Sequence, residues 1–280
     1  MATFPERALA SVNAALTWLF DVAVAPAISA APLTTLLLMS VVTGLAMLWV
    51  VGRTSNQPGI GAAKRGIQAG LFEIRLFNDD LGAVMRALGR VLWQNLRYLG
   101  HSMVPLAWVA LPLTLVIAQL QAFYGYDGLA LGAPSLLTMR TRGPAVAAGA
   151  ASLQASDAIR VDTPAVVLSG PGEVLWRIVA TTPGEHVVTI RTGSSELAKT
   201  VQVSTGAARR SPFRVSGLID QLLYPSEPPL PADTVATEIA LPYPEPGLEV
   251  LGWRVHWLVV YVVVSMITAF ALARRLGVTL

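Results

Sequence analysis

The chain has 280 residues, of which 54% are hydrophobic and 13% are charged, with a formal net charge of +3 and no cysteine. The lack of cysteine excludes a disulfide framework and a thiolate metal site. The basic residues form no cluster large enough to follow a phosphate backbone, so we expect no nucleic-acid partner.

Residues 8–25 form an apolar stretch with a polar side. Asn13, Thr17 and Asp21 fall on one helical face, and the apolar residues Leu9, Val12, Leu16, Leu19 and Phe20 fall near another. Within residues 1–30 this pattern predicts an N-terminal amphipathic helix lying on the outer leaflet, with a short tilted re-entrant segment as the alternative. The stretch lacks the pattern of a cleavable signal peptide, because Glu6 and Arg7 precede it and Asp21 interrupts it.

Three further apolar stretches, 33–51, 104–120 and 257–273, contain no Asp, Glu, Lys or Arg. Each is about as long as a helix needs to be to cross ~30 Å of hydrocarbon. A buried core helix is the alternative for any one of them, but three in so weakly charged a chain favour three transmembrane helices. The fold class expected is an α-helical membrane protein.

Basic residues give the expected orientation. The loop 52–103 carries seven basic and three acidic residues, and Arg274 and Arg275 follow the last span. By the positive-inside tendency, this loop and the C-terminus are cytoplasmic. The N-terminus and residues 125–250 are then extracytoplasmic, in a multi-pass protein of the bacterial inner (plasma) membrane.

The loop 54–98 predicts a cytosolic helical hairpin between the first two spans, within residues 31–124. Its first helix covers 61–77, and Asn78, Asp79 and Asp80 end it and cap a second helix. Each helix has an apolar face that we expect to pack against the other: Ile67, Leu71, Ile74 and Phe77 in the first, and Leu81, Val84, Met85, Leu88, Val91, Leu92 and Leu96 in the second. A solvated hairpin and an arm beside a membrane cavity both fit this spacing.

The segment 125–210 changes to short runs rich in Val, Ile and Thr, separated by Gly, Pro and Ser. These runs predict β-strands at 136–140, 159–161, 165–168, 174–180, 186–191 and 198–203. We expect an inserted β-sandwich whose last three strands resemble those of an immunoglobulin-like domain. Residues 211–250 are rich in proline and predict a stiff strap with a short helix near 219–223, which leads to the third span and tail in 251–280.

No pattern of catalytic residues stands out. His101, His186 and His256 are scattered along the chain, and neither a nucleophile elbow nor a phosphate-binding loop is present. The sequence therefore predicts a protein that is not an enzyme and that has no cofactor and no metal site.

Two sets of motifs carry a resemblance. Ser102-Met103-Val104-Pro105 with Leu111-Pro112 is similar to the "KPM…PI" start of a span in the YidC-type insertase superfamily, in its archaeal and endoplasmic-reticulum membrane complex branch. The close of the chain is similar to that family's "LPFP…GW…Y…S…RKLLGV" ending: Leu241-Pro242-Tyr243-Pro244, Gly252-Trp253, Trp257, Tyr261, Ser265 and Arg274-Arg275-Leu276-Gly277-Val278. The order of spans and hairpin matches as well.

The chain also departs from that family. About 115 residues, 125–238, stand where simple members have a short connection, and the first span lacks the arginine of bacterial YidC-like members, since Arg53 lies just past its end. The resemblance implies a polar intramembrane groove open to the cytosol. Its candidate client-contacting residues are Thr43, Arg53, Asn95, Arg97, His101, Ser102, Ser265 and Thr268.

Such a groove would lower the cost of moving a polar segment into lipid, because each unsatisfied backbone group costs several kcal/mol there. The resemblance therefore implies a membrane-protein insertase or insertion and folding chaperone, whose partners are the lipid bilayer, client membrane proteins and, through the outer β-sandwich, another envelope protein. The alternative is a structural or sensory envelope protein whose β-sandwich binds a partner while the helices anchor it. For single residues, back-bonding of Ser and Thr to a helix carbonyl, or anchoring of Arg97 at the interface, is the alternative role.

Overall fold

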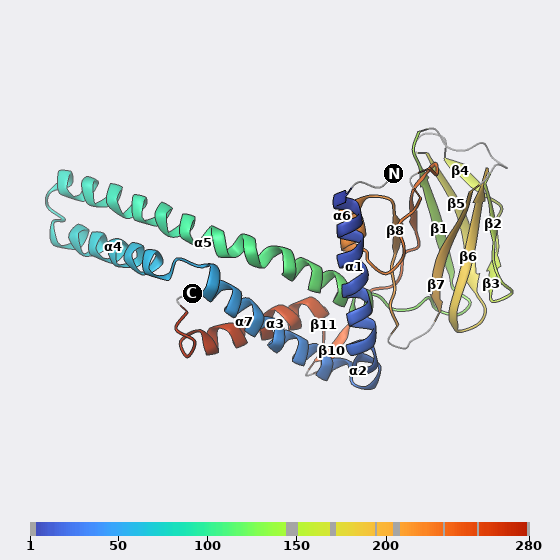
Figure 1. The fold of residues 1–280 in the computed structure, drawn as a ribbon, viewed down its shortest axis with the longest axis horizontal. Helices are drawn as coiled ribbons and strands as arrows, with labels where there is room; N and C mark the ends of the chain where they lie inside the picture. Colours follow the sequence, from blue (N-terminus) through green and yellow to red (C-terminus); the bar gives the residue numbers. More distant parts are fainter. Residues whose placement is uncertain are drawn as a thin grey trace. The chain divides into compact units, whose positions relative to one another are not determined.

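The computed structural model describes residues 4–143, 151–168, 172–193, 195–203, 208–231, 233–250 and 252–278. The chain divides into two compact units. The first comprises Met1–Thr35 and Leu115–Trp257, and the second comprises Leu36–Thr114 and Leu258–Leu280. Figure 1 gives the course of the chain and the labels of its elements.

The helices that could cross a membrane differ in part from those expected. In the described residues, three stretches are long and apolar enough: Ser11–Ala30, Pro32–Thr54 and Leu81–Tyr124. The first contains most of α1 (Phe4–Ala23) and α2 (Ala25–Ala30), where the sequence predicts an interfacial helix. Helix α7 (Trp257–Ala273) has the predicted bounds but only 17 residues. These helices are compatible with a membrane protein.

A long helical hairpin follows α3 (Pro32–Thr54). Its helices are α4 (Gln57–Leu76) and α5 (Leu81–Tyr124), and α5 runs without a break for 44 residues through the predicted second span. The predicted cap is present, because the Asp80 Oδ1 accepts a hydrogen bond from the Ala83 N–H at 3.0 Å. We call α4 with the first part of α5, up to residue 103, the arm.

In the contact between α4 and α5, small residues of α4 lie against side chains of α5, unlike the expected contact between large apolar residues. Ala63, Gly70 and Ala87 are buried there, and a Cβ built on Gly66 would lie 2.8 Å from Gln94 Cδ. A Cβ on Gly70 would clash with the Val91 side chain in the same way, so Val91 and Gln94 of α5 lie against glycines of α4. Most of the larger apolar residues expected in this contact are exposed instead: Leu71, Phe77, Leu81, Met85, Leu88, Leu92 and Leu96.

The β-region consists of two antiparallel sheets, and its strands include all six that the sequence predicts. One sheet has the order β3-β5-β1-β9-β8, with β4 also paired to β5, and the other has the order β2-β6-β7. The strands are β1 (Pro134–Thr141), β2 (Ala151–Gln154), β3 (Ile159–Val161), β4 (Val166–Leu168), β5 (Glu173–Ala180), β6 (Gly184–Thr192), β7 (Ser195–Val203), β8 (Phe213–Val215) and β9 (Ala236–Ala240).

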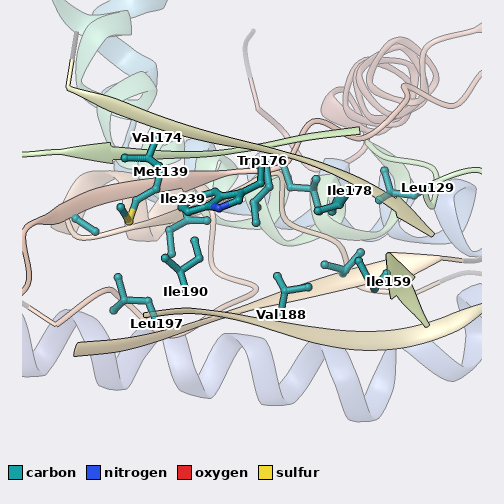
Figure 2. Packing of buried hydrophobic residues seen from close by; sticks show 14 of the residues in the cluster. Leu129, Met139, Ile159, Val174, Trp176, Ile178, Val188, Ile190, Leu197 and Ile239 are labelled. Atoms are coloured by element: carbon teal, nitrogen blue, oxygen red, sulfur yellow. The ribbon is translucent and has the colours of Figure 1, made fainter. Parts of the chain in front are cut away.

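Alternate residues of both sheets share one core. Met139, Trp176 and Ile239 of the larger sheet lie in the same buried cluster as Val188 and Ile190 of the smaller one, as Figure 2 shows. Each of these strands is thus buried on one face, as the alternation of apolar residues predicts. The comparison with an immunoglobulin-like domain stays a prediction.

The Pro-rich segment is part of the β-region and not only the connecting strap that the sequence predicts. It contributes β8, the short helix α6 (Leu218–Leu223) and β9, which lies between β1 and β8. Met139 of β1 is in register with Ile239, which is fully buried. Its prolines at 225, 228, 229 and 231 lie outside the strands, because proline cannot donate to a sheet ladder. A hairpin of β10 (Leu248–Val250) and β11 (Trp253–Val255), with Gly252 at φ +83°, precedes α7.

Candidate intramembrane groove and neighbouring clusters

Three of the eight predicted groove residues, Thr43, Ser265 and Thr268, lie where α3 contacts α7. The Ser265 Oγ is 3.0 Å from the carbonyl oxygen of Ser40 on α3 and 2.7 Å from that of Tyr261 on its own helix. Thr43 is buried beside Tyr261, and the Thr268 hydroxyl donates to the Val264 carbonyl at 2.8 Å. The hydroxyls of Ser265 and Thr268 are thus satisfied by backbone groups inside apolar helices.

The lack of a side chain at Gly44 allows α3 and α7 to approach closely at this point. A Cβ built on Gly44 would lie 2.7 Å from the Ser265 carbonyl oxygen and 3.1 Å from the Thr268 Cβ. No larger residue fits without moving one helix. We call this contact, made by Ser40, Thr43, Gly44, Ser265 and Thr268, the seam.

Four further groove residues lie on α5. The Asn95 Nδ2 donates to the Val91 carbonyl at 3.0 Å and the Ser102 hydroxyl to the Tyr98 carbonyl at 2.9 Å, so both bond within their own helix. Arg97 is exposed. His101 is half-buried against the start of α4, where a Cβ on Gly59 would lie 2.9 Å from its Nε2.

The eighth residue, Arg53, is exposed near the end of α3, with its guanidinium carbon 5.4 Å from the centre of the Trp49 ring. The structure therefore brings together one group at the seam and another along α5. That all eight line a single groove stays a prediction.

An exposed apolar strip lies along α5, and we call it the ridge; the sequence predicts that its first five residues pack within the hairpin. Its side chains recur at spacings of three and four, which places them along one side of the helix. They are 41% to 75% exposed: Leu81, Met85, Leu88, Leu92, Leu96, Leu99, Met103 and Leu106. Arg86, Arg90 and Arg97 fall on another side, where Arg90 pairs with Glu73 of α4.

A polar cluster within the first unit was also missed. The Gln119 Nε2 donates to the Thr17 hydroxyl at 3.2 Å, and the Gln119 Oε1 accepts from the Arg209 Nη1 at 2.9 Å. Arg209 also pairs with Asp21 at 2.9 Å and lies 4.8 Å from the centre of the Phe123 ring. Burial lowers the pKa of Arg209, and the Asp21 carboxylate opposes this change. We call Thr17, Asp21, Gln119 and Arg209 the latch.

The signal for the latch in the sequence is a single acid, Asp21, within an apolar stretch. Its partner lies 188 residues further along the chain, so spacing could not identify it.

A buried ion pair joins β7 to the Pro-rich segment. Lys199 is fully buried, and its Nζ donates to the Glu227 Oε1 at 2.8 Å and to the Ser211 carbonyl at 2.7 Å. Burial lowers the pKa of Lys199 and raises the pKa of Glu227, while their mutual attraction opposes both changes. The sequence alone gave no sign of this ion pair, although Lys199 occupies an inward-facing position of β7 where an apolar residue would be expected.

Among the described residues, no three His, Asp or Glu side chains are grouped so that they could hold a metal ion. His186 lies 3.0 Å from the Thr182 carbonyl oxygen through its Nε2, and the His256 ring is 6.0 Å from that of Trp257. Each histidine therefore has a local contact of its own.

No family model matches the chain, and no curated protein matches it. Among solved structures, a crystal structure of domains 4 and 5 of the S-layer protein SbsC is similar, with a TM-score of 0.20 and 13% identity. The match covers 28% of this chain and 47% of that one, so it spans about half of the S-layer protein's chain. A likeness this low carries no argument about fold or function.

Proposed function

We propose that the chain assists the insertion or folding of membrane proteins, as a relative of the YidC-type insertases, and that the ridge of α5 receives an apolar segment of the client. The observation that carries this proposal is the exposure of eight large apolar side chains in one uninterrupted strip. Burying a side chain of this size contributes about 1.5–3 kcal/mol, so a surface of this kind favours a partner.

The length of α5 indicates which part of the ridge lies outside the bilayer. Its 44 residues span ~66 Å, about twice the hydrocarbon thickness. The charge-free stretch 104–120, near the Tyr124 end of α5, is the part that suits the bilayer. The Leu81 end of α5 therefore extends out of the bilayer. The ridge therefore runs from the tip of the arm to the first turn inside the bilayer, and it offers a client an apolar path between them.

The side chains suit this role. Leucine and methionine accept partners of varied shape, and no charged residue interrupts the ridge. Arg97, nearer the bilayer on another side of α5, supplies a cation for acidic residues that flank an apolar segment. The proposed activity needs no cofactor and no covalent step.

The seam is the second part of the proposal. The Ser265 and Thr268 hydroxyls are bonded to backbone carbonyls and Thr43 is buried. A client therefore reaches these three residues when α3 and α7 separate. Arg53, Asn95, Arg97, His101 and Ser102 would then supply the polar side of a groove open at the same end. A partly polar groove lowers the cost of exposing a client's backbone groups to hydrocarbon.

We place the protein in the bacterial inner membrane with the arm and C-terminus in the cytoplasm. The support is the excess of basic residues in 52–103. Because the chain lacks cysteine, single cysteines at Asp79 and Glu196 can be labelled from either side of the membrane. Labelling of both from the same side would contradict this orientation.

Photocrosslinking tests the function. A photoreactive residue at Leu88 or Leu92 on the ridge should crosslink to nascent membrane proteins, whereas the same residue at Arg86 on the other side of α5 should crosslink far less. Positions Thr43, Ser102 and Ser265 report on the groove. Crosslinks to lipid alone at all ridge and groove positions would refute the proposal.

The second candidate is an envelope protein whose β-region binds a partner while the helices anchor it. One observation favours it: Leu136, Val166 and Leu168 are exposed on the outer face of the larger sheet. Crosslinks from Leu136 to another envelope protein, without client crosslinks from the ridge, would select this function.

A further inference from the structure

Helix α1 has the reverse of the polarity expected for a helix that faces water. Its outward side carries Val12, Trp18, Leu19 and Val22, which are 49% to 66% exposed. Its inward side carries the polar Asn13, which is buried, and Thr17, which bonds to Gln119. A helix that places polar residues inside and apolar residues outside is suited to a hydrocarbon solvent.

From Ser11 on, where side chains are described, the outward side carries no charged residue. The charged residue of the stretch Ser11–Ala30 is Asp21, at the border of the two sides, and Arg209 pairs with it. Trp18 combines a large apolar ring with an N–H donor, and such residues gather where hydrocarbon meets headgroups. These features fit a lipid leaflet better than a soluble protein partner.

The latch indicates the depth at which α1 lies. Thr17 and Asp21 are near the middle of the stretch Ser11–Ala30. Thr17 reaches Arg209 through Gln119, and Asp21 pairs with Arg209 directly. Arg209 and Arg210 precede β8, which holds Arg214, and the Arg210 Nη1 donates to the Tyr126 carbonyl. A helix that crosses the hydrocarbon could not hold so charged a segment at its midpoint, because burying those charges would cost too much.

The chain path agrees with a location at the surface. One residue, Ala31, separates α2 from α3, a 23-residue apolar helix. The end of α2 therefore lies where a membrane-crossing helix begins.

We propose that α1 lies flat in the leaflet next to the β-region, with Val12, Trp18, Leu19 and Val22 in contact with lipid, and that the latch fixes the β-region to this helix. The bound surface is a phospholipid leaflet at the level of the glycerol and upper acyl chains. This placement of α1 is independent of the proposed insertion activity, and it is the flat one of the flat, re-entrant and crossing arrangements that hydropathy leaves open.

Spin labels measure this directly. In the full chain, reconstituted in vesicles of phosphatidylethanolamine and phosphatidylglycerol, single cysteines at Val12, Trp18 and Val22 carry nitroxides, and collision with oxygen or a water-soluble nickel chelate gives the depth of each. We expect oxygen to dominate at all three and the depths to agree within a few ångströms. Leu19→Cys is a second probe of the same side, and Glu196→Cys on β7 is the control that reports water.

Three results would overturn the inference. A helix that crosses the bilayer would give depths at Val12 and Val22 that differ by up to ~15 Å, from 1.5 Å per residue. Dominance of the nickel chelate at Trp18 would place this side in water. Protection from both reagents at the three positions would show that protein covers it.

Discussion

A Cβ on Gly44 of α3 would lie 2.7 Å from the carbonyl oxygen of Ser265 on α7. The obstacle is backbone, which cannot rotate away as a side chain would. The contact between these two helices therefore depends on the absence of a side chain at this position.

Gly44→Ala should destabilise the full chain in detergent by about 1–3 kcal/mol, the usual cost of overpacking. The matched control is Gly89→Ala, because a Cβ there meets nothing within 4 Å and replacing glycine in an exposed helix gains up to ~1 kcal/mol. Thermal unfolding compares the two. Equal stability of the two variants would show that α3 and α7 can move apart freely.

A reversible lock tests whether a client enters the seam. With cysteines at Ser40 and Ser265, a disulfide should hold α3 and α7 together, and client crosslinking from Thr43 should fall and return on reduction. Crosslinking from Leu92 on the ridge should persist in the oxidised form. Unchanged crosslinking from Thr43 in the locked protein would remove the seam from the client's path.

Lys199→Met should destabilise the β-region by about 3–5 kcal/mol, because it leaves Glu227 buried without its partner. The double change Lys199→Met with Glu227→Gln should recover much of that loss. Hydrogen exchange of the β7 amides measures both. The control is Arg191→Met, whose exposed pair with Glu196 contributes less than about 1 kcal/mol. A loss as small as that of the control would contradict this prediction.

Tyr243 should make the β-region sensitive to alkali. Burial raises the pKa of its hydroxyl to about 12, from about 10 in the unfolded chain. Because the pKa of Tyr243 is higher in the folded than in the unfolded chain, its contribution to the free energy of unfolding is fully present below pH 10. This contribution, about 2.7 kcal/mol, is lost as the pH rises through 12. An ultraviolet difference titration of the natural chain against Tyr243→Phe should show a midpoint near 12, and a midpoint near 10 would refute the burial argument.

The β-region should be removable only when all of its strands are removed together. Replacing residues 128–242 by a Gly/Ser linker takes away every strand of the two sheets and should leave the arm and the seam folded, as hydrogen exchange can show. Replacing only 128–234 leaves β9 without β1 and β8, and this variant should aggregate. If both variants behave alike, β9 does not need its neighbours.

Local patterns predict most of the strands and helices. β3 has the predicted bounds and β5 and β6 lie within two residues of theirs, because alternation and turn residues act over a few positions. β9 escaped prediction, since prolines surround it and its pairing with β1 joins residues about a hundred positions apart. Contacts at that distance leave no periodic signal.

The site was harder to predict for a related reason. Helical spacing tells which residues share a face, but α5 has apolar residues on more than one face, and Ala87 and Val91 rather than Leu88 and Leu92 pack against α4. Glycines of α4 leave room for side chains of α5, since Gly70 lies against Val91 and Gly66 against Gln94. In α1, helical spacing also separates a polar face from an apolar face. Spacing does not tell which face packs against the protein, because that depends on whether water or lipid surrounds the helix.

The continuity of α5 has a mechanical consequence. A single helix from Leu81 to Tyr124 acts as a lever, so force applied at the tip of the arm reaches the far end without passing through a loop. Pro105 and Pro112 lack the N–H that would bond to the carbonyls of His101 and Trp108, and these are the two places where the lever bends most readily. A small change of angle at either proline sweeps the outer turns of the arm through many times the distance moved at the bend.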